Sequence, residues 1–233
     1  MKTIYTSFLK GILAGLAIGL GGFLYVLMTF IFQGDVAFLG KIFGSALFAV
    51  GLFLVCTFYL SLYTGKIGLV YEKKQSKEFY FSLPVMLLGN AIGAFALGYL
   101  CFFIFKDTAL IDSAKSAANA RLDFNSVGSY FNTCIMSFFC GVCVYLAVKS
   151  FNSNRLKPVG ILLLVFFVFI FVYSGFQHCI ANMFYFGFAN SIINKDGGFC
   201  WQLPVNLALV ILFNSLGPVV GVYLVKLIEK AKK

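Results

Sequence analysis

The chain has 233 residues, of which 61% are hydrophobic, 18% are aromatic and only 11% are charged. Because soluble globular proteins carry about 25% charged residues, this composition excludes a soluble domain, a disordered chain and a collagen-like or disulfide-rich scaffold. The formal net charge of +10 does not predict nucleic-acid binding, since no basic soluble segment is present to provide it. We expect one transmembrane domain over residues 1–233, surrounded by the lipid bilayer.

Six hydrophobic stretches are long enough to cross a bilayer, which takes about 20 apolar residues in a helix. In chain order they cover residues 11–32, 42–70, 79–105, 127–148, 158–189 and 203–225. An even number of spans places both termini on one side. Most of the 18 Lys and Arg residues would lie in the segments on that side, so the positive-inside rule predicts cytoplasmic termini. We expect a multi-pass integral protein of the cell's inner or plasma membrane.

The second and fifth stretches are too long for one straight helix, and each contains a polar interruption. The first interruption is LYTGKIG at residues 62–68, around Gly65, and the second is SGFQHCIAN at residues 174–182, around Gly175. Backbone that leaves a helix inside a bilayer must face protein or a watery cavity. Interrupted spans at matching positions of two halves are typical of a transport site. We therefore predict an all-α membrane fold with six transmembrane helices in an inverted 3+3 repeat, in which helices two and five are interrupted.

The third span of each half carries an Asn-x-x-Gly motif, at Asn90 and at Asn214. The simpler interpretation is helix packing, because Gly allows close approach and Asn forms hydrogen bonds between helices. The second interpretation is an internal duplication, which the paired interruptions support.

Lys66 and His178 are the residues of the predicted spans that readily carry a charge. A charged group at the bilayer centre costs about 2.5–3.5 kcal/mol on insertion scales, so both are functional candidates. Two alternatives stay open. His178 could be a neutral imidazole that joins two helices, and Lys66 could extend its ammonium group to the cytoplasmic surface instead of attracting anions at the inner mouth of a pore.

The predicted spans lack the groups of a catalytic site or a metal centre. No carboxylate lies within them to orient His178, and no Cys pair with metal-ligand spacing has His partners nearby. We expect no enzyme activity, no cofactor and no metal. A positive intramembrane charge favours a channel for a small monovalent anion or its weak acid. The alternatives are an aquaporin-like channel for a neutral solute such as water or ammonia, and a membrane subunit without a pore.

These residues resemble the formate/nitrite transporter family along nearly the whole chain. The most specific piece is SGFQHCIANMF at residues 174–184, which is similar to the family's Gly-aromatic-Glu-His…Ala-Asn-Met pattern. Supporting pieces are LAG at 13–15, LYTG at 62–65, LGNAIGA at 88–94, and Asn214 with Gly217. The resemblance implies an aquaporin-like protomer, a homopentamer with one pore per subunit, and passage of small anions such as formate, nitrite or hydrosulfide.

The resemblance also implies roles for individual residues. His178 would be the central residue of the pore and would face Thr64, and Asn182 belongs to the same motif. We add Lys66 to these pore residues because it follows the Thr-Gly pair. The apolar constrictions around the central chamber would be formed by Phe48, Leu52, Leu62, Val144 and Phe171. An imidazole suits such a chamber because its unperturbed pKa of about 6.5 lies near physiological pH.

Three positions depart from the family pattern. Gln177 stands where the family has Glu, and Gly141 stands where the family has Asn in span four. The spacing of the family's outer Lys leads to Asn125, so Arg121 or Lys115 would replace it if the loop contains an insertion. The last two departures bear on how the outer face attracts anions.

Overall fold

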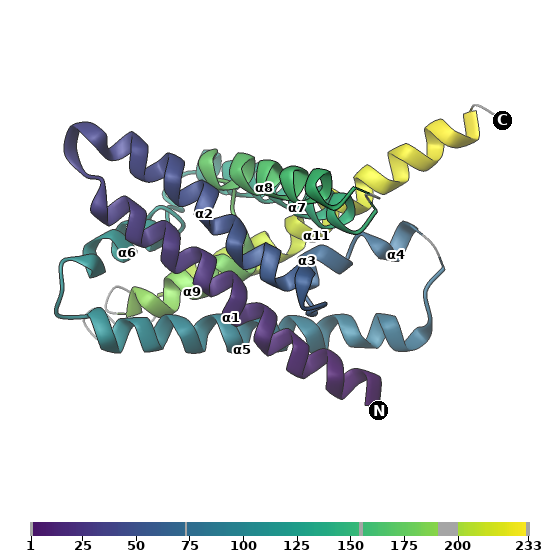
Figure 1. Cartoon of the computed structure of the whole chain (residues 1–233), viewed down its shortest axis with the longest axis horizontal. Helices are drawn as coiled ribbons and strands as arrows, with labels where there is room; N and C mark the ends of the chain where they lie inside the picture. Colours follow the sequence, from purple (N-terminus) through teal and green to yellow (C-terminus); the bar gives the residue numbers. More distant parts are fainter. Residues whose placement is uncertain (1, 73, 154–155, 191–199, 232–233) are drawn as a thin grey trace.

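The structure is a computed structural model that describes residues 2–72, 74–153, 156–190 and 200–231. Within these ranges it consists of helices and connecting segments, without strands. In chain order the elements are α1 (Lys2–Ile31), the short 3-10 helix η1 (Gly34–Val36), α2 (Ala37–Thr57), α3 (Tyr63–Lys66), α4 (Leu69–Glu72), α5 (Lys77–Phe105), α6 (Leu110–Asn119), α7 (Val127–Ser153), α8 (Lys157–Tyr173), α9 (Cys179–Phe188) and α11 (Gln202–Ala231) (Figure 1).

Five helical segments in the described ranges are long and apolar enough to cross a membrane. They are Ile4–Ile31, Gly34–Thr57, Lys77–Phe105, Val127–Ser153 and Gln202–Ile228. The fifth stretch of the sequence analysis is divided between α8, with 17 residues, and α9, with 10 residues. Large apolar side chains such as Phe81, Phe103 and Val127 are exposed on the bundle, as expected for a surface that contacts lipid or another subunit.

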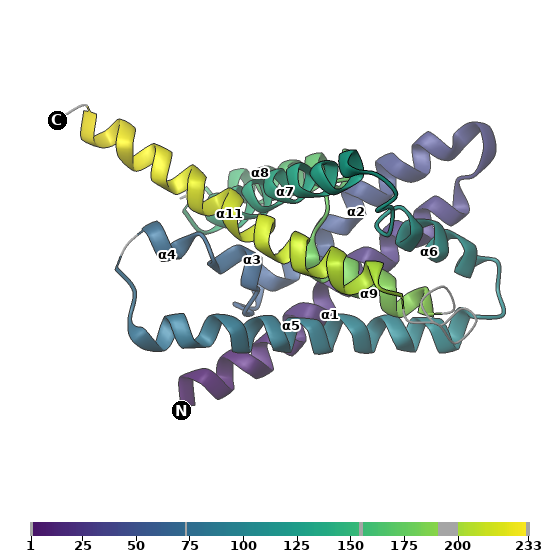
Figure 2. The same ribbon diagram turned by 180° about the vertical axis from the view of Figure 1, so that it is seen from behind.

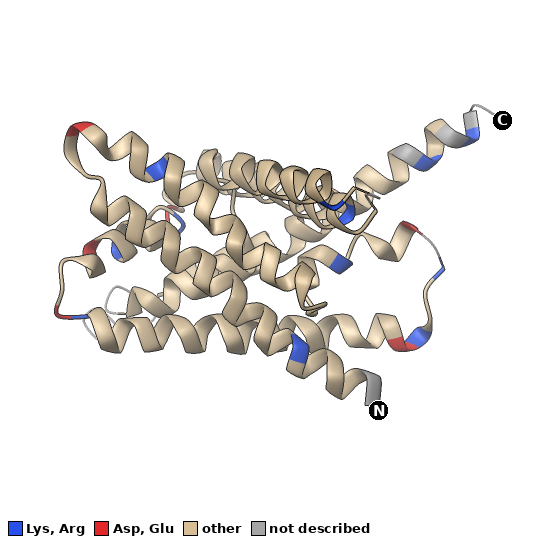
Figure 3. Cartoon of the chain, viewed as in Figure 1, with Lys and Arg blue, Asp and Glu red and all other residues tan. Residues whose placement is uncertain are grey.

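The bundle has two distinct ends. Both termini and α4 lie at one end, which we call the terminal end, and α6 and the α1–α2 turn lie at the opposite end, which we call the α6 end (Figure 1). Charged residues gather toward these two ends, and the middle of the bundle is almost free of them (Figure 3). This distribution fits a chain that crosses a membrane along the long axis of the bundle.

Helices α2 and α8 end with the same backbone structure. Tyr59 and Gly175 adopt left-handed conformations, with φ of 50° and 74°. Each of these residues, and the residue after it, donates its N–H group to a carbonyl of the preceding helix: Tyr59 to Cys56, Leu60 to Val55, Gly175 to Val172 and Phe176 to Phe171. Left-handed caps of this kind terminate helices. The two breaks are therefore built by the same local mechanism.

The position of the first break corrects the sequence analysis. The interruption that we expected at residues 62–68 around Gly65 overlaps the observed one only in part. Residues 58–62 are non-helical, Tyr63–Lys66 forms one helical turn, and residues 67–68 form a turn before α4. Gly65 serves packing instead, since a Cβ atom there would lie 3.1 Å from the Val148 side chain. Gly normally occupies the left-handed cap position. Tyr59 therefore gave no signal of the break, whereas Gly175 lies at the second break as expected.

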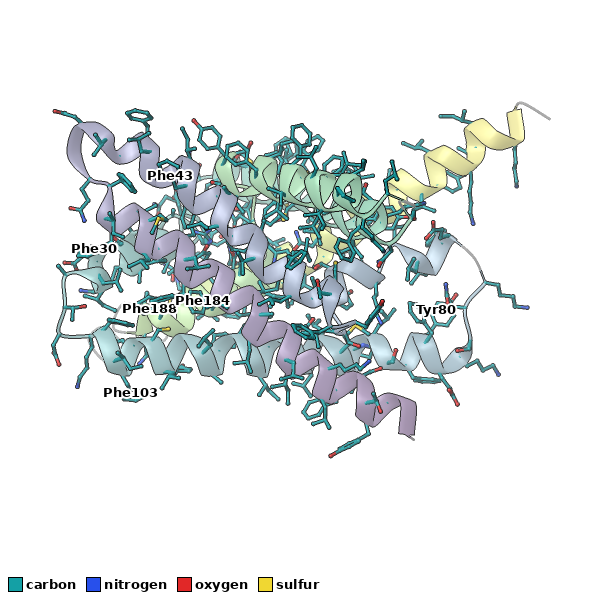
Figure 4. The ribbon with its side chains drawn as sticks, in the orientation of Figure 1. Phe30, Phe43, Tyr80, Phe103, Phe184 and Phe188 are labelled. Carbon is teal, nitrogen blue, oxygen red and sulfur yellow. The ribbon has the colours of Figure 1, made fainter. Side chains whose placement is uncertain are left out.

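Helix α9 forms the centre of the bundle near the α6 end. All ten of its residues are buried. Phe188 packs against the rings of Phe23 in α1 and Phe105 in α5, at centroid distances of 6.3 and 6.2 Å, and Phe184 and Phe188 are labelled in Figure 4. From behind, α11 crosses the molecule beside α7 and α9 and continues past the bundle at the terminal end (Figure 2). A short helix that starts at a break is thus enclosed by protein, as the bilayer requires.

Helix α6 was missed by the sequence analysis. It buries Leu110, Ile111, Ala114 and Ala118 on one face. Apolar residues at this helical spacing are a detectable signal, but the segment is too short and too polar to cross a membrane. It covers the α6 end of the bundle.

Candidate pore

The two breaks bring Thr64 and His178 into contact at the centre of the bundle. Thr64 lies in α3 and His178 is the N-cap of α9, and both are buried. The Thr64 Oγ1 atom lies 2.9 Å from His178 Nε2, and His178 Nδ1 accepts a hydrogen bond of 3.3 Å from the Ala181 N–H. A neutral imidazole that accepts at Nδ1 carries its proton on Nε2. His178 in this form donates to the Thr64 hydroxyl oxygen.

Cavities approach this pair from both ends. The α6-side cavity has a volume of about 340 Å³ and is lined by His178, Phe48 and Phe171, together with the polar side chains of Lys41 and Arg121. The terminus-side cavity has a volume of about 130 Å³, and its lining includes Leu62, Gly65, Lys66 and Val148. Thr64 lies in the stretch between them. The two cavities thus lie on either side of the buried Thr64–His178 pair.

All five residues expected at the constrictions are buried, at 3% exposure or less. The Phe48 and Phe171 rings meet edge to face with centroids 5.7 Å apart, and the Phe171 ring lies 6.0 Å from the His178 ring. Leu62 lines the terminus-side cavity. Leu52 and Val144 line neither of the two cavities. Apolar rings therefore flank the polar pair on the α6 side, and Leu62 does so on the terminal side.

Asn90 and Asn214 hold the backbone of the two breaks. Each Oδ1 accepts from the first N–H of the helix after the break, and each Nδ2 donates to a carbonyl in the break and to one in the first span of its half. Asn90 accepts from the Tyr63 N–H at 2.9 Å and donates to the carbonyls of Ser61 and Gly11, both at 2.8 Å. Asn214 accepts from the Cys179 N–H at 2.9 Å and donates to the carbonyls of Gln177 at 2.9 Å and Ser137 at 2.7 Å. Each side chain thus satisfies one N–H group and one carbonyl at its break that lack a helical partner.

Gly141 lies where α7 packs closely against the backbone of α11. A Cβ atom at Gly141 would lie 2.3 Å from the Asn214 backbone oxygen, and one at Gly15 would lie 2.2 Å from the Asn90 backbone oxygen. These distances allow no side chain without separating the helices. Each Asn therefore has its own glycine of a neighbouring helix against its backbone, in addition to the equivalent hydrogen bonds of its side chain.

Asn182 is fully buried in a network of amides and lines neither of the two cavities. Its Oδ1 accepts from Arg121 Nε at 2.8 Å, and its Nδ2 donates to Gln177 Oε1 at 3.1 Å and to Asn206 Oδ1 at 2.9 Å. Asn206 Nδ2 also donates to Gln177 Oε1, at 2.7 Å, and Gln177 Nε2 donates to Thr133 Oγ1, at 3.2 Å. The sequence analysis missed Asn206 and Thr133, because a single polar residue in an apolar helix has no distinguishing spacing.

Of the two outer cations that the sequence analysis considered, only Arg121 reaches the cavity. Its guanidinium lies 4.2 Å from the centre of the Tyr185 ring, within range of a cation–π interaction. Lys115 instead forms an ion pair with Asp112 at 3.0 Å on α6. Asn125 lies in an exposed segment and donates to Asp123.

Lys66 lies at the end of α3 and is half-buried in the lining of the terminus-side cavity. The carboxylate of Glu72 pairs with Lys149 at 2.5 Å, and Lys66 takes part in neither of the ion pairs found in the described ranges. Its ammonium group therefore has no carboxylate in contact. Either of the roles expected from the sequence is compatible with this position.

The chain was compared with known families and structures. A family model described as "Formate/nitrite transporter" matches residues 1–228. The uncharacterized transporter YrhG of Bacillus subtilis is 29% identical over 96% of this chain and 84% of its own length. The formate channel FocA of Haemophilus influenzae is 24% identical over 78% of this chain, and the match covers 66% of the length of that channel.

Solved structures have the same fold. A structure described as a pentameric formate channel with formate bound matches with a TM-score of 0.83 and 26% identity, over 99% of this chain and 98% of that chain. An ion channel described as a member of the FNT family matches with a TM-score of 0.72 and 20% identity, over 98% of this chain and 90% of that chain.

Proposed function

Because this chain belongs to the formate/nitrite transporter family, we propose that it is a transmembrane channel for small monovalent anions or their weak acids, of the formate, nitrite or hydrosulfide class. The family consists of transporters and channels rather than enzymes. The most direct support for this substrate class is the structural match to a channel with formate bound, at 26% identity over 99% of this chain.

The protomer is a single aquaporin-like domain with six transmembrane helices in an inverted 3+3 repeat. Two pairs of features support the repeat. The helix caps at Tyr59 and Gly175 have equivalent hydrogen bonds. Asn90 and Asn214 form equivalent hydrogen bonds with the backbone of the break that comes after each cap. The terminal end faces the cytoplasm, as the positive-inside rule predicts, and the α6 end faces outward.

The hydrogen bond between Thr64 and His178, with a cavity on either side, is the observation on which the proposed pathway rests. An anion passes Phe48 and Phe171, meets this pair, and leaves past Leu62. Crossing apolar rings removes water from the anion, which costs free energy unless polar groups replace it. The Thr64 hydroxyl and the His178 imidazole provide hydrogen bonds at this point. When the imidazole takes up a proton from water and passes it to the anion, the neutral weak acid forms and His178 returns to its neutral form, which lowers the charge that must cross.

Basic groups gather anions on both sides of the pore. Arg121 does so in the outer cavity, and Lys66 does so in the inner one. The protein is a multi-pass component of the cell membrane and assembles as a homopentamer with one pore in each subunit. The pentameric state of the matched formate channel supports this assembly.

A panel of anion fluxes into proteoliposomes tests the proposed function. Formate, nitrite and hydrosulfide should enter at rates that saturate and that each of the other two anions reduces, and sulfate should be excluded as a divalent control. Each anion is measured at two pH values, because the concentration of the weak acid changes with pH. Rapid water flux without any anion entry would contradict the proposal and would favour a channel for neutral solutes.

A further inference from the structure

Resting on the proposed channel function, we propose that Arg121 binds the anion in the outer cavity and that uncharged Gln177 leaves the charge of Arg121 unneutralised. The charge at position 177 then determines how tightly monovalent anions bind from the outer face. Gln177 lines the same cavity as Arg121 and is a specificity-determining position for entry.

Arg121 is fixed in place by groups that leave part of its guanidinium free. Its Nε donates to Asn182 Oδ1 at 2.8 Å, one terminal nitrogen (Nη1) donates to the Ala117 carbonyl, and the plane lies over the Tyr185 ring. The other terminal nitrogen, Nη2, donates to no group of the described residues, and Arg121 lines the 340 Å³ cavity. A guanidinium held in this way needs little reorganisation to bind an anion.

Among the residues that the structure describes, no negatively charged side chain contacts Arg121 or belongs to the amide network beside it. Asn182, Gln177, Asn206 and Thr133 are all uncharged, and the residues that line the cavity include Lys41 and Arg121 but no carboxylate. A partly buried cation without a counter-ion is costly. An anion in the cavity supplies that counter-ion, so the network favours anion occupancy.

The geometry at Gln177 allows its charge to be changed without loss of its hydrogen bonds. Its Oε1 accepts from Asn182 and Asn206, and its Nε2 donates to the Thr133 hydroxyl at 3.2 Å. A carboxylate of the same shape keeps both acceptor contacts, and the Thr133 hydroxyl can rotate to donate to the second oxygen. Gln177→Glu therefore changes the charge of the network from one positive unit to zero and preserves its structure.

The test measures the KM and the maximal rate of radiolabelled formate entry from the outer face, in membrane vesicles of defined orientation. Gln177→Glu and Arg121→Gln both make the network neutral, and each should raise KM by about tenfold or more, because one unit charge near the anion is lost or cancelled. Arg121→Lys keeps the charge and should keep KM within about threefold of wild type. Gln33→Glu is the matched control, since Gln33 is exposed at the α6 end and lines neither cavity.

The outcomes separate this inference from the proposed function. If the wild-type protein takes up no formate, the proposed function fails. If the wild-type protein transports formate but folded Gln177→Glu has a wild-type KM, the charge at position 177 has no such role and the inference is overturned. A KM for Arg121→Lys that is raised as much as for Arg121→Gln also overturns it, because Arg121 would then act through shape and not charge. That last comparison tests the part of the inference that concerns the charge of Arg121, and it does not depend on the folding of Gln177→Glu.

Discussion

Replacing Asn214 with leucine should destabilise the fold by about 2–6 kcal/mol. The Asn214 Oδ1 is the acceptor for the Cys179 N–H at 2.9 Å, and its Nδ2 donates to the Gln177 carbonyl at 2.9 Å. Leucine has a similar volume but offers neither group. Two buried backbone groups then lose a partner, at about 1–3 kcal/mol each. The third bond, to the Ser137 carbonyl, adds less because that carbonyl belongs to a helix and accepts a helical bond as well.

The measurement is the apparent free energy of unfolding in detergent, with flux per folded protein recorded in parallel. Asn132→Leu is the matched control, because Asn132 is exposed on the same helix as Ser137. Asn90→Leu should show a loss of similar size, since Asn90 makes the equivalent contacts at the other break. A loss of less than about 1 kcal/mol for Asn214→Leu, relative to the control, would refute the claim that this side chain supports the break.

Three further predictions concern the breaks and the cavities. Gly175→Ala should lower the free energy of unfolding by about 1 kcal/mol, because φ is 74° at this position. Tyr59→Gly should raise it by a comparable amount, because Tyr59 has φ of 50° and an exposed side chain. Chemical denaturation measures both changes, and shifts of the opposite sign would contradict the assignment of the two caps. Gly141→Asn should prevent accumulation of folded protein, because its Cβ would lie 2.3 Å from the Asn214 oxygen; a normal yield by size-exclusion chromatography would argue against this packing. Lys66→Met should raise the KM for formate leaving from the terminal side about three- to tenfold, with entry from the outer face changed less; unchanged efflux kinetics would indicate that Lys66 extends to the surface and takes no part in the pore.

The sequence predicted the membrane class and the paired interruptions from hydrophobic length and polar residues alone. Gly175 and the polar run around it pointed to residues 174–182, and the non-helical residues between α8 and α9 are 174–178. The first break was placed too late, because Tyr59 occupies a left-handed position that usually holds glycine. Gly65 drew attention instead, although it lies within a helical turn and packs against Val148.

The candidate site was only partly predictable from the sequence. His178 and Thr64 stood out, but their hydrogen bond joins residues of two different helices, and no local spacing specifies such a contact. The partners of Arg121 were missed for the same reason. Asn182 was expected in the pore, whereas it lies behind the cavity wall and orients Arg121. Long-range hydrogen bonds between single polar residues become visible only when the helices are packed together.

The pH dependence of formate flux through His178→Ala tests the central claim most directly. Wild-type protein in proteoliposomes should show formate flux that changes between about pH 5 and pH 8, because proton exchange between His178 and the anion depends on the proton concentration. The folded variant should lose this dependence, because alanine can neither bond to Thr64 nor exchange a proton with the anion at the constriction. A variant with wild-type flux and a wild-type pH profile would contradict the role assigned to the contact between Thr64 and His178.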